Sequence, residues 1–213
     1  MDSLERRWVR TGGIAGVLAA VGYLAILFVP LPSAARRLVF FFIPLAGILF
    51  VIGLSRLLRA RRDSVTLQVA TLFGIIAFAV MNVMAVVQYS IHIWTRMGVP
   101  AATGGITPEM LDWVRQSVNS VQLGLDVSFD IFGLVSFVLF ALLMFAHPSF
   151  GLVFGIAGCA LPAATLALNL HTFPVPPKPD LGPLVGLWLG AVAVRMLIPT
   201  RSTDTPTSAP ARQ

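Results

Sequence analysis

The chain has 213 residues, of which 57% are hydrophobic and only 11% are charged, and its mean hydropathy is +0.87. Soluble domains carry about 25% charged residues, so this composition excludes a water-soluble globular domain and predicts a surface that mostly faces lipid. The net charge is +6. Because most of the arginines flank hydrophobic stretches, this charge indicates membrane orientation signals rather than nucleic-acid binding. The single cysteine, Cys159, excludes an intrachain disulfide bond.

Six stretches are long and apolar enough to cross a bilayer, which requires about 20 residues. We expect these spans at about residues 11–29, 38–58, 66–93, 124–147, 150–171 and 181–198. The sequence therefore predicts an all-α fold, a six-transmembrane-helix bundle that forms a single integral membrane domain over residues 1–199. Residues 200–213 contain mostly small and polar residues, and they are predicted to form a disordered cytoplasmic tail.

The first predicted span follows a basic segment, as the apolar part of a signal peptide would. No Ala-x-Ala-like cleavage site follows it, so we expect a retained span. Small residues recur every four positions in the first and sixth spans: Gly12, Gly16 and Ala20, and then Gly182, Gly186 and Gly190. This spacing lets helix backbones approach closely in lipid. We therefore expect these residues to pack inside the bundle, with homodimerisation as the alternative.

Basic residues are distributed unevenly between the two sides of such a bundle. One side would hold Arg6, Arg7, Arg10, Arg56, Arg59, Arg61, Arg62, Arg201 and Arg212. The other side would hold Arg36, Arg37, Arg96, Arg115 and Lys178. Because cytoplasmic loops carry the excess of Lys and Arg, both termini are predicted to be cytoplasmic.

The fourth span is predicted to extend outward as an amphipathic helix. Thr107, Pro108 and Glu109 are typical of a helix start, with Thr at the N-cap, Pro at the first helical position and an acid in the first turn. A polar stripe then follows at spacings of three and four: Asp112, Arg115, Asn119, Gln122, Asp126 and Asp130. Such spacings place side chains on one helix face. We expect Asp126 near the membrane boundary and Asp130 about one turn inside it.

Polar residues gather at the predicted outer ends of spans three, four and five. They are Gln88, His92, Asn119, Gln122, Asp126, Asp130, Asn169 and His171. An ionisable residue inside a membrane is expensive and indicates function by default. The sequence therefore predicts an outer-face polar cavity between these three spans, with those residues and Arg115 as ligand-binding candidates. Asp130 would need a partner there, for which His92, His171, Asn169 and Arg115 are the candidates.

The connection over residues 171–183 is dense in proline and is expected to be extended and stiff. It would lie on the same outer side as the predicted polar cavity. In that position it could lie across the polar ends of spans three to five.

Three interpretations of this polar face compete. It could bind or help to transport a small molecule or a proton, with Asp126 and Asp130 sharing one proton at an i, i+4 spacing. It could be structural, either as an outward-open hydrated notch or as the seat of another subunit in a larger membrane complex. It could belong to a metal-dependent membrane hydrolase, with His92, His171, Asp126 and Asp130 as weak candidate ligands.

Established catalytic motifs give no support to an enzyme. The sequence contains no HExxH motif, Walker loop, dinucleotide fingerprint or nucleophile elbow. No cofactor is predicted, and the question of catalysis is left open. The expected partners are the lipid bilayer and a small-molecule ligand.

Three segments carry a resemblance to a known group of proteins. They are RTGGIAG at 10–16, FDIFGL at 129–134 and HPSFGLVFGIAG at 147–158. Through these segments, and over nearly the whole chain, the sequence resembles a group of uncharacterised six-span bacterial membrane proteins that share a domain of unknown function. The resemblance implies a location in the bacterial cytoplasmic (inner) membrane, and it transfers no catalytic residue.

Overall fold

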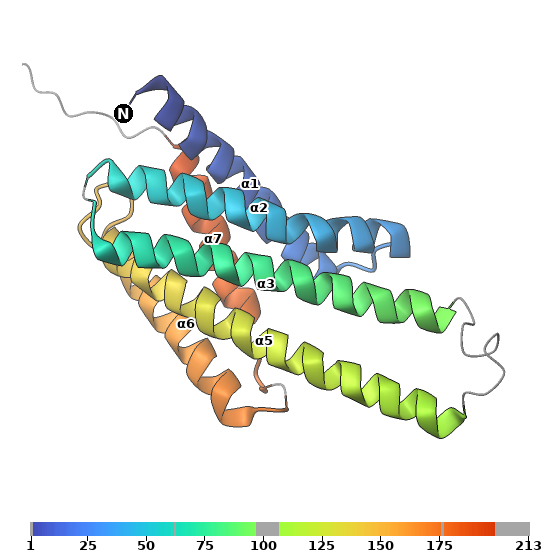
Figure 1. Ribbon diagram of the computed structural model, residues 1–213. Coiled ribbons are helices and arrows are strands. Elements are labelled where there is room, and N and C mark those ends of the chain that lie inside the picture. Colours follow the sequence, from blue (N-terminus) through green and yellow to red (C-terminus); the bar gives the residue numbers. More distant parts are fainter. Residues whose placement is uncertain (1, 62, 97–106, 176, 199–213) are drawn as a thin grey trace, which may run out of the picture.

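A computed structural model describes residues 2–61, 63–96, 107–175 and 177–198, apart from the side chains of residues 91–96 and 108. All regular secondary structure in these ranges is helical (Figure 1). The helices are α1 (Ser3–Phe28), α2 (Ser33–Arg59), α3 (Val65–Arg96), α5 (Pro108–Met144), α6 (Gly151–Thr172) and α7 (Gly182–Leu197). The predicted tail, residues 200–213, lies outside the described residues.

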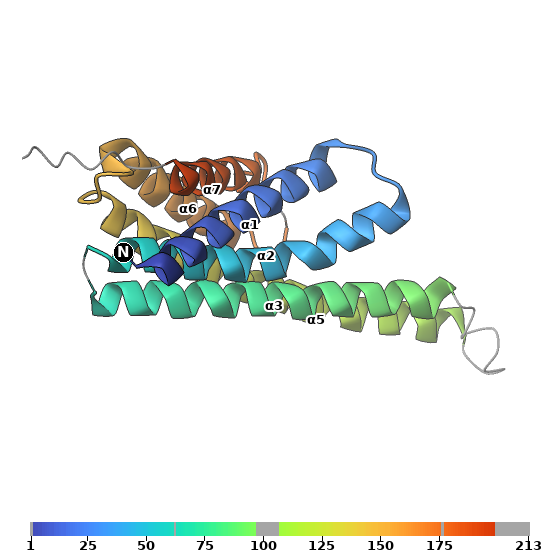
Figure 2. The ribbon, with the colours of Figure 1, turned by 90° about the horizontal axis from the view of Figure 1, so that it is seen from above.

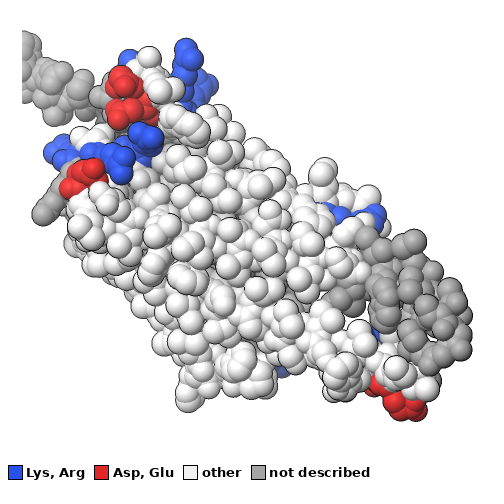
Figure 3. Space-filling view, viewed as in Figure 1, with Lys and Arg blue, Asp and Glu red and all other residues white. Residues whose placement is uncertain are grey.

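Five of these helices are long and apolar enough to cross a membrane, namely α1, α2, α3, α5 and α6. The sixth, α7, is also apolar but has only 16 residues. Each helix overlaps one predicted span, so the all-α prediction is confirmed and the helices are compatible with a membrane bundle. Figure 3 shows charged side chains mainly at the two ends of the visible face, with an uncharged band between them. Such a band is expected where a protein meets lipid hydrocarbon.

The helices pack as neighbours around one continuous core. α1 contacts α2 and α7, α3 contacts α2 and α5, and α6 packs against α5. Figures 1 and 2 show α3 and α5 side by side along most of their length. Fully buried side chains of the core include Val51, Leu54, Phe140, Met144 and Val192. The core therefore joins α2 to α5 and α7.

Small residues bring α1 very close to its neighbours. A Cβ atom added at Gly12 would lie 2.7 Å from the Cα atom of Gly53 on α2. A Cβ atom at Gly16 would meet Ala193 of α7 at the same distance. The predicted packing of small residues inside the bundle is thus found for Gly12 and Gly16, and homodimerisation stays a prediction.

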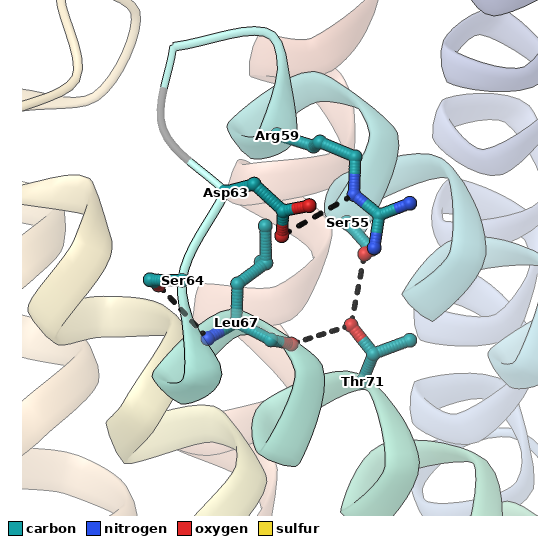
Figure 4. Close-up of polar contacts among 6 residues, drawn as sticks. All are labelled: Ser55, Arg59, Asp63, Ser64, Leu67 and Thr71. Carbon is teal, nitrogen blue, oxygen red and sulfur yellow. Dashed lines mark hydrogen bonds and ion pairs between the residues drawn. The ribbon is translucent and has the colours of Figure 1, made fainter.

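Hydroxyl groups tie α2 to α3 near their connection (Figure 4). The Thr71 hydroxyl donates to the Leu67 carbonyl at 2.7 Å and lies 2.8 Å from the Ser55 hydroxyl. Arg59 and Asp63 form an ion pair at 3.6 Å beside these contacts. Because Ser55 is buried, its pairing with Thr71 satisfies a polar group that would otherwise destabilise the interface.

The ends and bends of the helices follow local sequence signals. Thr107 accepts a hydrogen bond from the backbone N–H of Met110 at 3.3 Å, which confirms the predicted start of α5. The helix then runs for 37 residues, longer than a single span requires. In α2, Pro44 lies inside the helix, where it removes one backbone hydrogen bond and favours a bend. Figure 2 shows the first part of α2 diverging from α3.

Candidate functional site

A cavity of about 230 Å³ lies inside the bundle, and all six described helices contribute to its lining. Its polar lining residues are Tyr23, Asp130, Thr165, Asn169 and Asp180. The sequence predicted a cavity between α3, α5 and α6 alone. The observed cavity also includes α1, α2 and α7, because α1 and α7 pack together across the bundle.

The centre of this polar set is a side-chain pair between α5 and α6. Asn169 donates from Nδ2 to Oδ2 of Asp130 at 2.7 Å. The other amide atom, Asn169 Oδ1, is buried and has no hydrogen-bond partner among the described residues. Because most buried polar atoms in proteins have a partner, this unpaired acceptor indicates room for a donor that the described residues do not supply.

Tyr23 and Asp180 approach the cavity beside the start of α7. A Cβ atom at Gly182 would lie 2.8 Å from the Tyr23 hydroxyl oxygen and 3.0 Å from Asp180 Oδ1. Asp180 Oδ1 also accepts a hydrogen bond from the Gly182 backbone N–H at 2.8 Å. Asp180 is exposed, and it lines the same cavity as Asp130. The glycine thus makes room for a second carboxylate near the first.

The remaining walls are apolar and rich in aromatic rings. Four phenylalanines, Phe50, Phe78, Phe129 and Phe137, line the cavity together with aliphatic side chains. Phe78 is in edge-type contact with Phe129, with the ring centroids 6.3 Å apart. No Lys, Arg or His is among the described residues that line the cavity. The cavity therefore combines two carboxylates with a largely apolar body.

The two carboxylates that the sequence suggested as a proton-sharing pair differ in their relation to the cavity, and the sharing of a proton stays a prediction. Asp130 lines the cavity, whereas Asp126 is half-buried one turn earlier and does not line it. Gln122 is also half-buried outside the cavity, and Asn119 is exposed. Arg115 is exposed and lies 4.0 Å from Asp112. The predicted stripe from Asp112 to Asp126 thus runs along α5 outside the cavity.

The other predicted site residues lie apart from Asp130. His171 is exposed near the end of α6. Gln88 lines a different pocket, between α1, α2 and α3. The side chain of His92 lies outside the described residues. Of the candidate partners proposed for Asp130, Asn169 is the one that forms a hydrogen bond with it in the described structure.

The described residues bring together no group of three His, Cys, Asp or Glu side chains that could hold a metal ion. Of the candidate metal ligands, Asp130 is directed toward Asn169, and His171 is exposed. The geometry of the described residues therefore gives the hydrolase interpretation no supporting observation.

Three polar residues of the cavity were not among the candidates selected from the sequence: Tyr23, Thr165 and Asp180. Tyr23 is a single tyrosine in an otherwise apolar helix segment, and Asp180 lies in the proline-rich connection before α7. Asp180 brings this connection to the cavity that Asp130 and Asn169 line, and its course over the end of α3 stays a prediction. Thr165 precedes Asn169 by four residues on α6, so the helical spacing of these two polar residues was the available signal.

Comparisons of the chain with protein-family models, with curated proteins and with solved structures find no match.

Proposed function

We propose that this chain is a multi-pass membrane protein that binds a small, positively charged molecule in the cavity around Asp130. The observation that carries the proposal is the Asp130–Asn169 pair, in which the buried Asn169 Oδ1 atom has no donor among the described residues. Both side chains line a cavity with a second carboxylate, Asp180, and without a basic lining residue among those described.

The charge of the site favours a cationic ligand. An ionised carboxylate only accepts hydrogen bonds, and an amide oxygen accepts as well. Asp130, Asp180 and Asn169 Oδ1 together offer acceptors and negative charge. Asp130 is half-buried, whereas Asp180 is exposed. Burial of a charge is costly, and a cation that donates hydrogen bonds to Asp130 offsets that cost. An ammonium group has both properties.

The shape of the site favours a small ligand with an apolar body. Its volume of about 230 Å³ is below the roughly 300–1,000 Å³ of pockets for drug-sized ligands. The faces of the lining phenylalanines attract cations and also accommodate apolar groups. The ligand class that fits is therefore a small organic amine rather than a bare metal ion or a large metabolite.

The location and orientation are part of the same proposal. We place the protein in the bacterial cytoplasmic membrane with both termini in the cytoplasm, since the arginine-rich ends would then follow the positive-inside rule. With that orientation, Asp180 lies in an outward connection. The cavity would then take its ligand from the outer side, either as a binding protein or as part of a transport process.

The direct test uses three probes of similar size that differ in charge: benzylamine, benzyl alcohol and benzoate. Binding to the full chain in detergent micelles is measured by titration calorimetry and by the shift of the thermal unfolding temperature. We expect benzylamine to bind and to stabilise, and the other two to have little effect. Asp130→Asn should weaken benzylamine binding about 10- to 100-fold, as expected for loss of a charged hydrogen-bond partner.

The matched control is Asp126→Asn, which makes the same change one turn earlier on α5, at a residue that does not line the cavity. Its benzylamine affinity should fall by clearly less than that of Asp130→Asn, because Asp126 is near the site but does not line the cavity. Equal binding of benzyl alcohol and benzylamine would contradict the charge argument. Equal losses in Asp126→Asn and Asp130→Asn would contradict the assignment of the site.

A further inference from the structure

A second pocket lies at the opposite end of α2 from the Arg59–Asp63 pair, and none of its lining residues belongs to the cavity around Asp130. Its volume is about 390 Å³, and α1, α2 and α3 contribute to it. Arg36 and Arg37 from the first turn of α2 line it with Gln88 and Tyr89 of α3. Figure 3 shows basic side chains at this end of the visible face.

Contacts with both helices hold the Arg37 guanidinium in place. Its Nε atom donates to the Ser33 carbonyl at 3.1 Å, and Nη1 donates to the Tyr89 hydroxyl oxygen at 3.1 Å. The guanidinium carbon also lies 5.6 Å from the centre of the Tyr89 ring. A guanidinium has five N–H donors, so these two hydrogen bonds leave donors for a ligand. The fixed orientation lowers the entropy lost when an anion binds.

The pocket is positively charged without a compensating acid. No Asp or Glu is among its described lining residues. Neither Arg36 nor Arg37 is in an ion pair with any residue that the structure describes. Both Arg36 and Arg37 line the pocket, and a guanidinium group can bind phosphate through paired N–H donors. The polar part of the pocket therefore suits a phosphate group.

The rest of the pocket suits a hydrocarbon chain. Ile26, Phe40, Phe41 and Ala85 form an apolar wall next to the arginines. Leu38, on the same helix, is a large exposed hydrophobic residue. Basic side chains next to an apolar surface at a helix end are the arrangement that anionic lipid head groups recognise. A free phosphate ion would use the arginines but would gain nothing from this wall.

We propose that this pocket binds an anionic phospholipid, with its phosphate on Arg36 and Arg37 and the start of an acyl chain against Phe40 and Ile26. The phosphate chemistry is shared with free inorganic phosphate, and the apolar wall favours the lipid. The site is independent of the proposed amine site, since the two have no lining residue in common.

The test is native mass spectrometry of the full chain, titrated with dioleoylphosphatidylglycerol or with dioleoylphosphatidylcholine. We expect a discrete phosphatidylglycerol adduct at concentrations where phosphatidylcholine gives little. Arg36→Gln with Arg37→Gln should weaken the anionic lipid about 30-fold, since each basic residue near an anionic surface contributes about a factor of five. Excess inorganic phosphate should leave the adduct in place.

The matched control is Arg6→Gln with Arg7→Gln, another adjacent pair, near the start of α1. It removes the same charge and should retain the adduct. Equal losses in both double variants, equal binding of the two lipids, or displacement of the lipid by inorganic phosphate would each overturn the proposal.

A conservative pair of substitutions tests the same site in case the glutamine variant does not fold. Arg36→Lys with Arg37→Lys keeps the charge but removes the planar donor pairs, so it should weaken the lipid by about 3- to 10-fold. Unchanged binding in this lysine variant would overturn the assignment to the guanidinium pair. The thermal unfolding temperature of each variant, measured in lipid-free detergent, establishes that the compared proteins are folded.

Discussion

Asn169 on α6 donates a hydrogen bond from Nδ2 to Oδ2 of Asp130 on α5, at a distance of 2.7 Å. The two residues are 39 positions apart in the chain, so this bond links two helices rather than neighbouring turns. It places a carboxylate in the cavity and keeps it paired. It also directs the remaining amide atom, Asn169 Oδ1, into a buried position without a partner among the described residues.

The first prediction concerns the coupling of this pair. Asn169→Leu should destabilise the fold by about 1–2 kcal/mol, because it removes the donor and leaves the Asp130 carboxylate buried without it. Asp130→Leu with Asn169→Leu should be less destabilising than the sum of the single changes, since both polar groups are then gone. The measurement is a double-mutant cycle of unfolding free energies in detergent. Additive effects would show that the pair is not coupled.

The second prediction contrasts two glycine positions. Gly12→Ala should destabilise the protein by about 1–3 kcal/mol, because the new Cβ atom would lie 2.7 Å from the Gly53 backbone, which cannot move aside without separating α1 from α2. Gly124→Ala on α5 has no atom within 4 Å of the new Cβ. It should stabilise by about 0.5–1 kcal/mol, because alanine favours a helix. The unfolding temperatures should therefore change in opposite directions.

The third prediction concerns the turn between α5 and α6. His147 is buried there, and its Nδ1 atom accepts a hydrogen bond from the Ser149 backbone N–H at 3.2 Å. Burial lowers the pKa of His147, and the nearby charges of Arg61 and Arg195 lower it further, while a backbone hydrogen bond at Leu57 acts in the opposite direction. The His147 imidazole is therefore harder to protonate in the folded chain than in the unfolded chain.

The sign of the resulting pH dependence follows from proton uptake. Below the ordinary histidine pKa of about 6.5, the unfolded chain binds a proton at His147 that the folded chain resists. Stability from this residue is therefore present above pH 6.5 and declines as the pH falls below it. The unfolding temperature, measured from pH 8 to pH 5, should show this decline. In His147→Asn the decline should be smaller, because asparagine keeps an acceptor but does not titrate.

A control for this pH dependence is His171→Asn. His171 is exposed near the end of α6, and its replacement should leave the decline unchanged. An identical decline in His147→Asn and the unmodified chain would assign the acid sensitivity to other groups.

The fourth prediction concerns membrane orientation. In a Cys159→Ser background, which lacks cysteine, single cysteines replace the exposed residues Ser3 at the start of α1 or Ser33 at the start of α2. In right-side-out vesicles, a membrane-impermeant maleimide should label the Ser33→Cys protein. It should label the Ser3→Cys protein only after the membrane is opened, because the arginine-rich end is predicted to be cytoplasmic. The reverse pattern would invert the predicted orientation and place the Asp130 cavity toward the cytoplasm.

Sequence patterns were sufficient for the helices because helix formation in lipid depends on local properties. A span needs about 20 apolar residues, and its backbone hydrogen bonds are satisfied within the segment. The cap at Thr107 is also local, since the donor and the acceptor are three residues apart. Pro44 likewise acts on the adjacent turn of its own helix.

The polar stripe on α5 shows that a local pattern does not predict which residues of one helix face line the cavity. Spacings of three and four predict a common face, but each step of four residues turns that face by about 40°. Asp126 and Asp130 therefore point in somewhat different directions, and only Asp130 lines the cavity. A stripe identifies the face of one helix, whereas the partner of each residue depends on how the next helix crosses it.

The sequence by itself determined that this is an all-helical protein with a lipid-facing surface and that Asp130 is an unusual charge within an apolar helix. Only the tertiary structure selected Asn169 as the partner of Asp130 and added Tyr23 and Asp180 to the same cavity. The physical reason is that hydropathy and helix periodicity act along one segment. Contacts between segments depend instead on the close approach of α1, α2 and α7, which is set by where side chains are small enough to allow it.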